Sequence, residues 1–244
     1  MNNNLHSAPG SKSSAFQTGI MAAAVVASMF IGTVAVNAQP SPKSNWYLTA
    51  GAQGVVDATG SGPDIDFGNQ VLVHGKTHYD EGHSLNIAVG REFNIGNEVG
   101  NLPNLRIEGQ YWDGQVGRKS VDLGAVNPSL YDKVKLRALF LNGFIRFAKT
   151  DHLRLWFGPG IGYAWTRFPD ASYATPCGCL KAAKSDGLAW QVKLQAERMI
   201  SAKTSIFGEL GYLKFQGADS GGLPAAHYND LGLTVVGVGV ITRF

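Results

Sequence analysis

The chain has 244 residues, which is enough for one all-β domain with a targeting segment but leaves no room for a second globular domain. Charged residues make up 16% of the chain, below the roughly 25% of ordinary soluble domains, while glycine reaches 31 residues and aromatic residues 10%. The formal net charge is only +3, and no run of lysine and arginine along the chain resembles a phosphate-binding patch. These values predict a single domain and argue against nucleic acid as a partner.

The first segment has the features of an export signal. No residue between 13 and 42 is charged, and the stretch 20–36 is apolar. Val36 and Ala38 place small residues at the third and first positions before a cut after Ala38, as signal peptidase sites require. We therefore expect residues 1–38 to be a signal peptide. The alternative is an uncleaved anchor helix, because the apolar stretch reaches the lower edge of the length needed to cross a bilayer.

Eight later segments alternate apolar and polar residues with a period of two, which is the pattern of a β-strand. Each is at least as long as the roughly 9 to 11 residues that a tilted membrane strand requires. The segments are 46–57, 83–93, 104–113, 133–148, 153–167, 186–200, 203–216 and 230–244. No window after residue 42 approaches 18 consecutive apolar residues, so the chain after the signal is predicted to contain no membrane-spanning helix.

The two faces of these segments differ in polarity. In 186–200, one face carries Leu188, Trp190, Val192, Leu194 and Ala196, and the other carries Ala189, Gln191, Lys193, Gln195 and Glu197. One face suits lipid and the other suits a polar lumen. The segment 133–148 is apolar on both faces. We assign Asn142 to the lumen because a buried amide needs polar partners, and this turns Arg137 toward lipid near the outer rim.

The connections between the segments alternate in length. The long ones are 58–82, 114–132, 168–185 and 217–229, and the shorter ones are 94–103, 149–152 and 201–202. Long outer loops and short inner turns alternate in this way when both termini of a membrane barrel lie on the inner side. A soluble sandwich would scatter its loop lengths. The fold class predicted is therefore all-β, an eight-stranded antiparallel up-and-down transmembrane β-barrel over 46–244, preceded by a short lead at 39–45.

The last segment, LGLTVVGVGVITRF, places Val236, Val238, Val240 and Phe244 on one face and ends on an aromatic residue. It resembles the C-terminal assembly signal of outer-membrane barrels. Together with WYLTAGAQG, LRLWFGPGIGYAW and FGELGYLKF, it makes residues 46–244 resemble the outer membrane β-barrel domain family, specifically the small opacity-type and OmpA/OmpX-like proteins. The resemblance implies a location in the cell outer membrane, contact with outer-membrane lipid, and folding by the barrel assembly machinery, which would read the strand that ends at Phe244.

Barrels of eight strands generally fill their interiors with side chains. Six charged residues are predicted to face inward: Arg106, Glu108, Arg154, Lys193, Glu197 and Glu209. A salt-bridged plug is the natural interpretation, and a proton or ion path is the alternative.

Two further groups of residues are candidates for chemistry. Cys177 and Cys179, in TPCGCL, are expected to be oxidised in an exported protein, provided that Gly178 allows the tight turn that their spacing requires. The alternatives are an intermolecular or free pair and a metal site. The stretch HGKTHYDEGH holds donors that zinc or copper prefers, but solvated loop side chains are the favoured interpretation. Its donors are His74, His78, Asp80, Glu81 and His83. No metal or cofactor is therefore predicted.

Some small barrels of this membrane are enzymes that act on lipid A, so a lipid A-modifying enzyme is a further hypothesis. Ser84 follows His83, but nucleophilic catalysis needs a serine, a base and an acid within hydrogen-bond reach of one another. Pairing of the first and last strands is expected to place His227 near residues 54–58, where only Asp57 is ionisable. No catalytic set is predicted.

The leading hypothesis is a non-enzymatic, porin-like surface barrel. Its four mobile loops would serve adhesion, host contact or envelope integrity through an extracellular host or envelope ligand. The alternative is a small-solute conduit or a barrel that binds a hydrophobic ligand.

Overall fold

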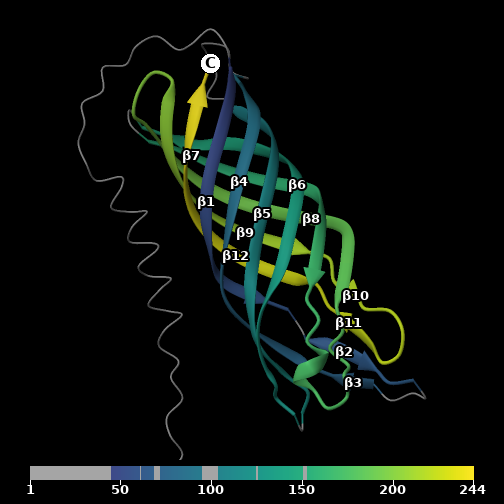
Figure 1. Ribbon diagram of the computed structural model, residues 1–244. Helices are drawn as coiled ribbons and strands as arrows, with labels where there is room; N and C mark the ends of the chain where they lie inside the picture. Colours follow the sequence, from purple (N-terminus) through teal and green to yellow (C-terminus); the bar gives the residue numbers. More distant parts are fainter. Residues whose placement is uncertain (1–44, 61, 69–71, 95–103, 125, 151–152) are drawn as a thin grey trace, which may run out of the picture.

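The computed structural model describes residues 45–60, 62–68, 72–94, 104–124, 126–150 and 153–244. The predicted signal peptide, almost all of the lead and most of the turn 94–103 lie outside these residues. Within the described part, twelve strands form one sheet, and the eight longest close a barrel (Figure 1). The first and last barrel strands pair antiparallel from Tyr47 with Arg243 to Thr59 with Gly232. The predicted fold class is confirmed.

The barrel strands follow one another around the ring in chain order, each antiparallel to its neighbours. They are β1 (Trp46–Thr59), β4 (Lys76–Phe93), β5 (Leu105–Asp122), β6 (Ser129–Lys149), β7 (Leu153–Phe168), β8 (Ala183–Met199), β9 (Thr204–Phe215) and β12 (Leu231–Arg243). The end that carries the C-terminus is called the inner end, and the opposite end is called the outer end. A tight turn at the inner end joins β8 to β9, where the Ser201 amide donates to the Thr204 carbonyl over 3.0 Å.

The alternation of side chains decides which face of each strand meets lipid. On β6, Leu141 is 60% exposed on the outside, whereas Asn142 is 1% exposed in the lumen. This register confirms the assignment of the ambiguous segment, and it leaves the Arg137 side chain on the outer surface, where Asp113 of β5 pairs with it at 2.8 Å. Within the described residues, no helix is long and apolar enough to cross a membrane.

The segments predicted as four long loops contain much strand structure. The barrel strands continue past the apolar band, so that β4 begins at Lys76 and β5 ends at Asp122. The remaining segments fold over the outer end as a cap, which consists of residues 169–182 and four short strands (Figure 1). These strands are β2 (Pro63–Asp66), β3 (Leu72–His74), β10 (Ala218–Asp219) and β11 (Ala225–Tyr228).

The cap forms because inward-facing apolar residues are also present at the outer end of the barrel, beyond the level of the apolar outer band. Its core consists of Ile65, Ala171, Cys179 and Leu180 of the cap together with Val121 of β5 and Leu130 of β6. Most of the chain neighbours of these residues are polar or glycine, so the segments look like solvated loops in sequence although one face is buried. Burial of that face against other segments stabilises the pairing.

Candidate functional site

The inner half of the lumen contains a cluster of charges centred on Glu197 of β8. Its carboxylate accepts a hydrogen bond from Arg243 over 2.5 Å, a second from Arg106 and a third from the Trp156 indole over 3.1 Å. Arg154 lies 3.9 Å from the same carboxylate. Glu197 therefore holds three basic residues from three different strands inside the barrel.

A second cluster lies at mid-height around Lys193. Its ammonium is 3.9 Å from both Glu108 and Glu209 and donates to Gln110 over 3.0 Å. Tyr47 joins the two clusters, because its hydroxyl donates to Glu108 over 3.3 Å while its ring lies beneath Arg106. The structure thus places the six predicted lumen charges in two linked clusters.

Sequence reasoning missed two members of the inner cluster, Glu92 and Arg243. Glu92 lies 3.4 Å from Arg106 and 3.8 Å from Arg243. The signal for Arg243 was present, because it is out of phase with Phe244 and Val240 on the last strand and must therefore face the lumen.

The outer half of the lumen is apolar. Residues from all sides of the barrel form one buried cluster there, among them Trp112, Leu136, Phe140, Phe215 and Leu233. The Trp112 indole donates to Gln53 over 2.7 Å and so marks the boundary with the polar half. Among the described residues, the only buried side-chain polar atoms without a partner are Thr77 Oγ1 and Arg106 Nε. The lumen is filled with packed and hydrogen-bonded side chains.

Arg118 of β5 joins the barrel to the cap. It donates to Asp132 through two nitrogens, over 2.9 and 2.6 Å, and also to the Tyr228 hydroxyl and the Pro169 carbonyl, each over 3.2 Å. Burial alone would lower the pKa of Arg118, but Asp132 and Tyr228 outweigh it and raise the pKa. Phe168 stacks on the Tyr228 ring at 4.2 Å between centroids. Nothing in the sequence distinguishes Arg118 from other polar residues of a predicted loop.

The two cysteines lie within the cap. Cys177 and Cys179 are joined by a disulfide, with their Cα atoms 5.1 Å apart, and Gly178 between them has a positive φ of 58°. That backbone region favours glycine. Cys179 is fully buried in the cap core.

The five predicted metal-type donors are spread along two strands. His74 lies on β3, where its Nδ1 is 2.8 Å from Asp64, whereas His83 lies on β4 and bonds to Gln115. Within the described part of the chain, no three histidine, cysteine or acidic side chains are placed to share a metal ion.

The expected position of His227 is wrong. It pairs with Asp64 of β2 and its Nδ1 lies 2.8 Å from Asp219 of β10, because the chain turns into the cap before β12 begins. Ser84 and His83 point to opposite faces of β4, with the Ser84 hydroxyl donating to Gln53 in the lumen. The structure therefore does not bring Ser84, His83 and His227 together as a catalytic set.

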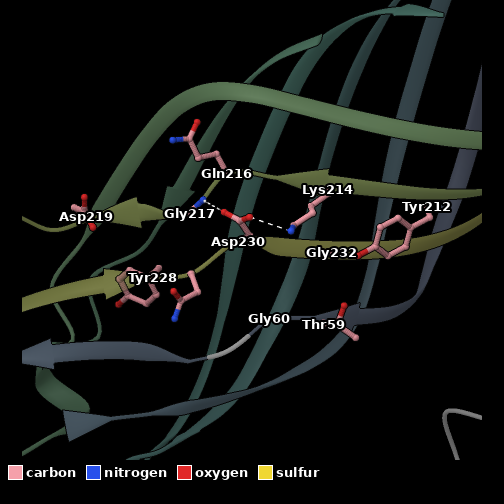
Figure 2. A pocket seen from close by; sticks show the side chains of 11 residues that line it. Thr59, Gly60, Tyr212, Lys214, Gln216, Gly217, Asp219, Tyr228, Asp230 and Gly232 are labelled. Carbon is pink, nitrogen blue, oxygen red and sulfur yellow. Dashed lines mark hydrogen bonds and ion pairs between the residues drawn. The ribbon is translucent and has the colours of Figure 1, made fainter. Parts of the chain in front are cut away.

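One hollow of about 740 Å³ lies in the wall near the outer end, where β9 stops and β12 starts (Figure 2). Asp230 sits in it, 3.1 Å from the Lys214 ammonium and accepting from the Gly217 amide over 3.1 Å. Its lining is mostly polar. On the lumen side, the buried residues Leu213, Phe215 and Leu231 close the barrel beside it.

A closed antiparallel barrel with an apolar outer band and a filled lumen belongs to the class of transmembrane β-barrels. The fold of the chain is that of an outer membrane β-barrel. Among solved structures, the outer membrane protein OprG from Pseudomonas aeruginosa matches with a TM-score of 0.58 at 16% identity, covering 84% of this chain and 98% of its own.

Two other barrels match with lower scores. The outer membrane protein AlkL, solved in lipid bilayers, has a TM-score of 0.49 at 13% identity over 87% of this chain and 96% of its own. Neisserial surface protein A has a TM-score of 0.46 at 13% identity over 82% and 98%. Neither a family model nor a curated protein sequence matches the chain.

Proposed function

We propose that this protein is a non-enzymatic outer-membrane barrel that presents a rigid cap at the cell surface for adhesion, host contact or envelope integrity. The observation that carries the proposal is the construction of the cap. It shares a buried core with the outer ends of β5 and β6, contains a disulfide, and is anchored to the barrel by Arg118. A preformed surface binds a partner at a lower entropic cost than mobile loops do.

The filled lumen favours this function over a conduit. A solute moving along the axis would have to part the ion pairs around Glu197 and then the apolar side chains around Phe140 and Phe215. Both barriers are large, because one separates buried charges and the other desolvates the solute.

We also propose the route by which the chain reaches the membrane. Export would follow cleavage after Ala38, leaving 39–45 as a short lead. Val236, Val238, Val240 and Phe244 would then form the signal read by the barrel assembly machinery. In support, these four side chains face outward, and the Phe244 amide donates to the Trp46 carbonyl over 3.2 Å at the seam that closes the barrel.

The test compares the full chain with a variant in which the cap segments 62–75, 169–182 and 217–229 are replaced by short glycine–asparagine turns. Heat-modifiable migration on a gel establishes that both barrels are folded. We expect flat single-channel traces from the full chain. We also expect cells that produce the variant to lose host-cell attachment or detergent resistance relative to cells that produce the full chain.

Discrete conductance steps in the full chain would instead favour the conduit. Unchanged attachment and detergent resistance with the variant would contradict a role for the cap. Lipid analysis of a deletion strain completes the comparison, since an altered acyl pattern would reveal a lipid-modifying activity.

A further inference from the structure

Three basic side chains stand side by side on the outer surface of the barrel. In the register of the strands, Lys135 of β6 lies directly opposite Arg167 of β7, and Arg167 lies directly opposite Lys184 of β8. All three side chains are exposed. Residues directly opposite one another on neighbouring strands have Cβ atoms roughly 4.5 to 5.5 Å apart. The three positive charges therefore form one continuous row.

This row destabilises the free protein, because like charges directly opposite one another on a sheet repel. The nearby carboxylates interact with other side chains. Asp113 pairs with Arg137 at 2.8 Å, and Asp186 accepts a hydrogen bond from Tyr163. Among the described residues, no carboxylate forms an ion pair with any of the three. An anion from outside the chain would relieve the repulsion.

The row borders a hollow of about 410 Å³ in the outer surface. Lys135, Arg167 and Lys184 line it together with Trp165, Asp186 and the Arg137–Asp113 ion pair, so four basic side chains face two acidic ones in one cleft. Arginine can hold two phosphate oxygens in a fork, and lysine adds a mobile point charge. The cleft therefore has the size and the chemistry to accept a phosphate group.

The position of the cleft indicates where that phosphate comes from. On the same strands and two outward-facing rows closer to the inner end, the outward residues are Tyr111, Leu139, Tyr163 and Leu188, all exposed. The row between them and the basic row contains Trp165 together with Asp113, Arg137 and Asp186. Tyrosine and tryptophan mark the level of the headgroups in membrane proteins. The basic row therefore begins where the apolar band of the outer leaflet ends.

We propose that this cleft, lined by Lys135, Arg137, Arg167 and Lys184 beside Trp165, binds a phosphate group on the headgroup of an outer-leaflet lipid. The lipid's acyl chains would lie against the apolar row below it. The proposal does not depend on the function of the cap.

The test uses the full refolded protein in zwitterionic detergent micelles, with calorimetric titration of lipid A. The variant carries Lys135→Gln, Arg167→Gln and Lys184→Gln. The matched control carries Lys76→Gln, Lys119→Gln and Lys203→Gln, which remove the same charge from exposed positions that do not line the cleft. Heat-modifiable migration establishes that each protein is folded.

We expect the wild type and the control to bind lipid A equally and the cleft variant to bind it roughly a hundredfold more weakly, at about fivefold for each basic residue near an anionic surface. Lipid A stripped of its phosphates should bind the wild type as weakly as intact lipid A binds the cleft variant. Equal binding by the cleft variant and the control, or no effect of dephosphorylation, would overturn the proposal. Inorganic phosphate binding as tightly as lipid A would show an anion site that does not recognise a lipid.

Discussion

Arg243, the residue before the C-terminus, donates a hydrogen bond to Glu197 over 2.5 Å inside the barrel. The same carboxylate binds Arg106, and both acidic and basic side chains are withdrawn from water, with Glu197 0% and Arg106 1% exposed. One carboxylate thus links the closing strand β12 to β5 and β8. The inner end of the barrel is held by this link as well as by the backbone pairing of its strands.

Glu197→Gln should destabilise the barrel strongly. The substitution leaves buried arginines without a negative partner, and breaking a buried ion pair from one side costs about 3 to 5 kcal/mol. Urea unfolding in lipid vesicles, followed by the gel mobility of the folded form, measures the change. Glu81→Gln, at an exposed position of β4, is the control and should behave as the wild type. Equal midpoints for the two variants would show that the cluster contributes little.

Arg118→Gln should release the cap while leaving the barrel folded. Two of the four hydrogen bonds of Arg118 reach the cap, at Tyr228 and Pro169, and the other two fix the guanidinium against Asp132 of β6. A hydrogen bond to a charged group contributes about 1.5 to 3 kcal/mol. We expect faster cleavage of the cap by a soluble protease, with no loss of heat-modifiable migration. Lys119→Gln, the exposed neighbour, provides the comparison. Cleavage at the wild-type rate would mean that the apolar core alone holds the cap in place.

Alkaline pH should weaken the folded state through Tyr228. Burial raises the pKa of its hydroxyl above the ordinary value of 10.0, although Arg118 partly opposes this. Between the ordinary and the raised pKa, the unfolded chain has lost this proton while the folded chain retains it. The free energy of unfolding is therefore unaffected by this group below about pH 10 and falls as the pH rises further. In Tyr228→Phe this part of the fall should be absent, and identical pH profiles for the two proteins would contradict the assignment.

The cap cysteines should be unreactive until they are reduced. Thiol titration of denatured protein is expected to find none before reductant and two afterwards, as follows from the disulfide between Cys177 and Cys179. Such a short loop constrains the unfolded chain only slightly, so Cys177→Ser should cost about 1 to 2 kcal/mol. Two reactive thiols before reduction would exclude the bridge.

Deletion of Phe244 should impair assembly in cells more than it impairs folding in the test tube. The side chain of Phe244 is exposed on the outside of the barrel, and its amide bonds to Trp46 at the seam. We expect less heat-modifiable protein in outer-membrane fractions but normal refolding in detergent. Deleting the residue without changing the amount in the membrane would remove its proposed role as an assembly signal.

Sequence alone determined the architecture and the direction of most side chains. A strand has a period of two, so the phase of Leu188 against Gln191, or of Phe244 against Arg243, follows from counting along the chain. Even the ambiguous β6 was resolved correctly by asking where the amide of Asn142 could find partners. These features are local, and local geometry can be inferred from consecutive residues.

Only the tertiary structure decided how far the strands extend, how the segments between them fold into a cap, and which charges meet. Arg118 finds Tyr228, and Lys135 stands beside Arg167 and Lys184, because strand register brings distant segments to the same level of the barrel. Register depends on pairing summed over whole strands and on what the cap buries. The chain has no run of basic residues, and its basic row exists only once β6, β7 and β8 pair in register.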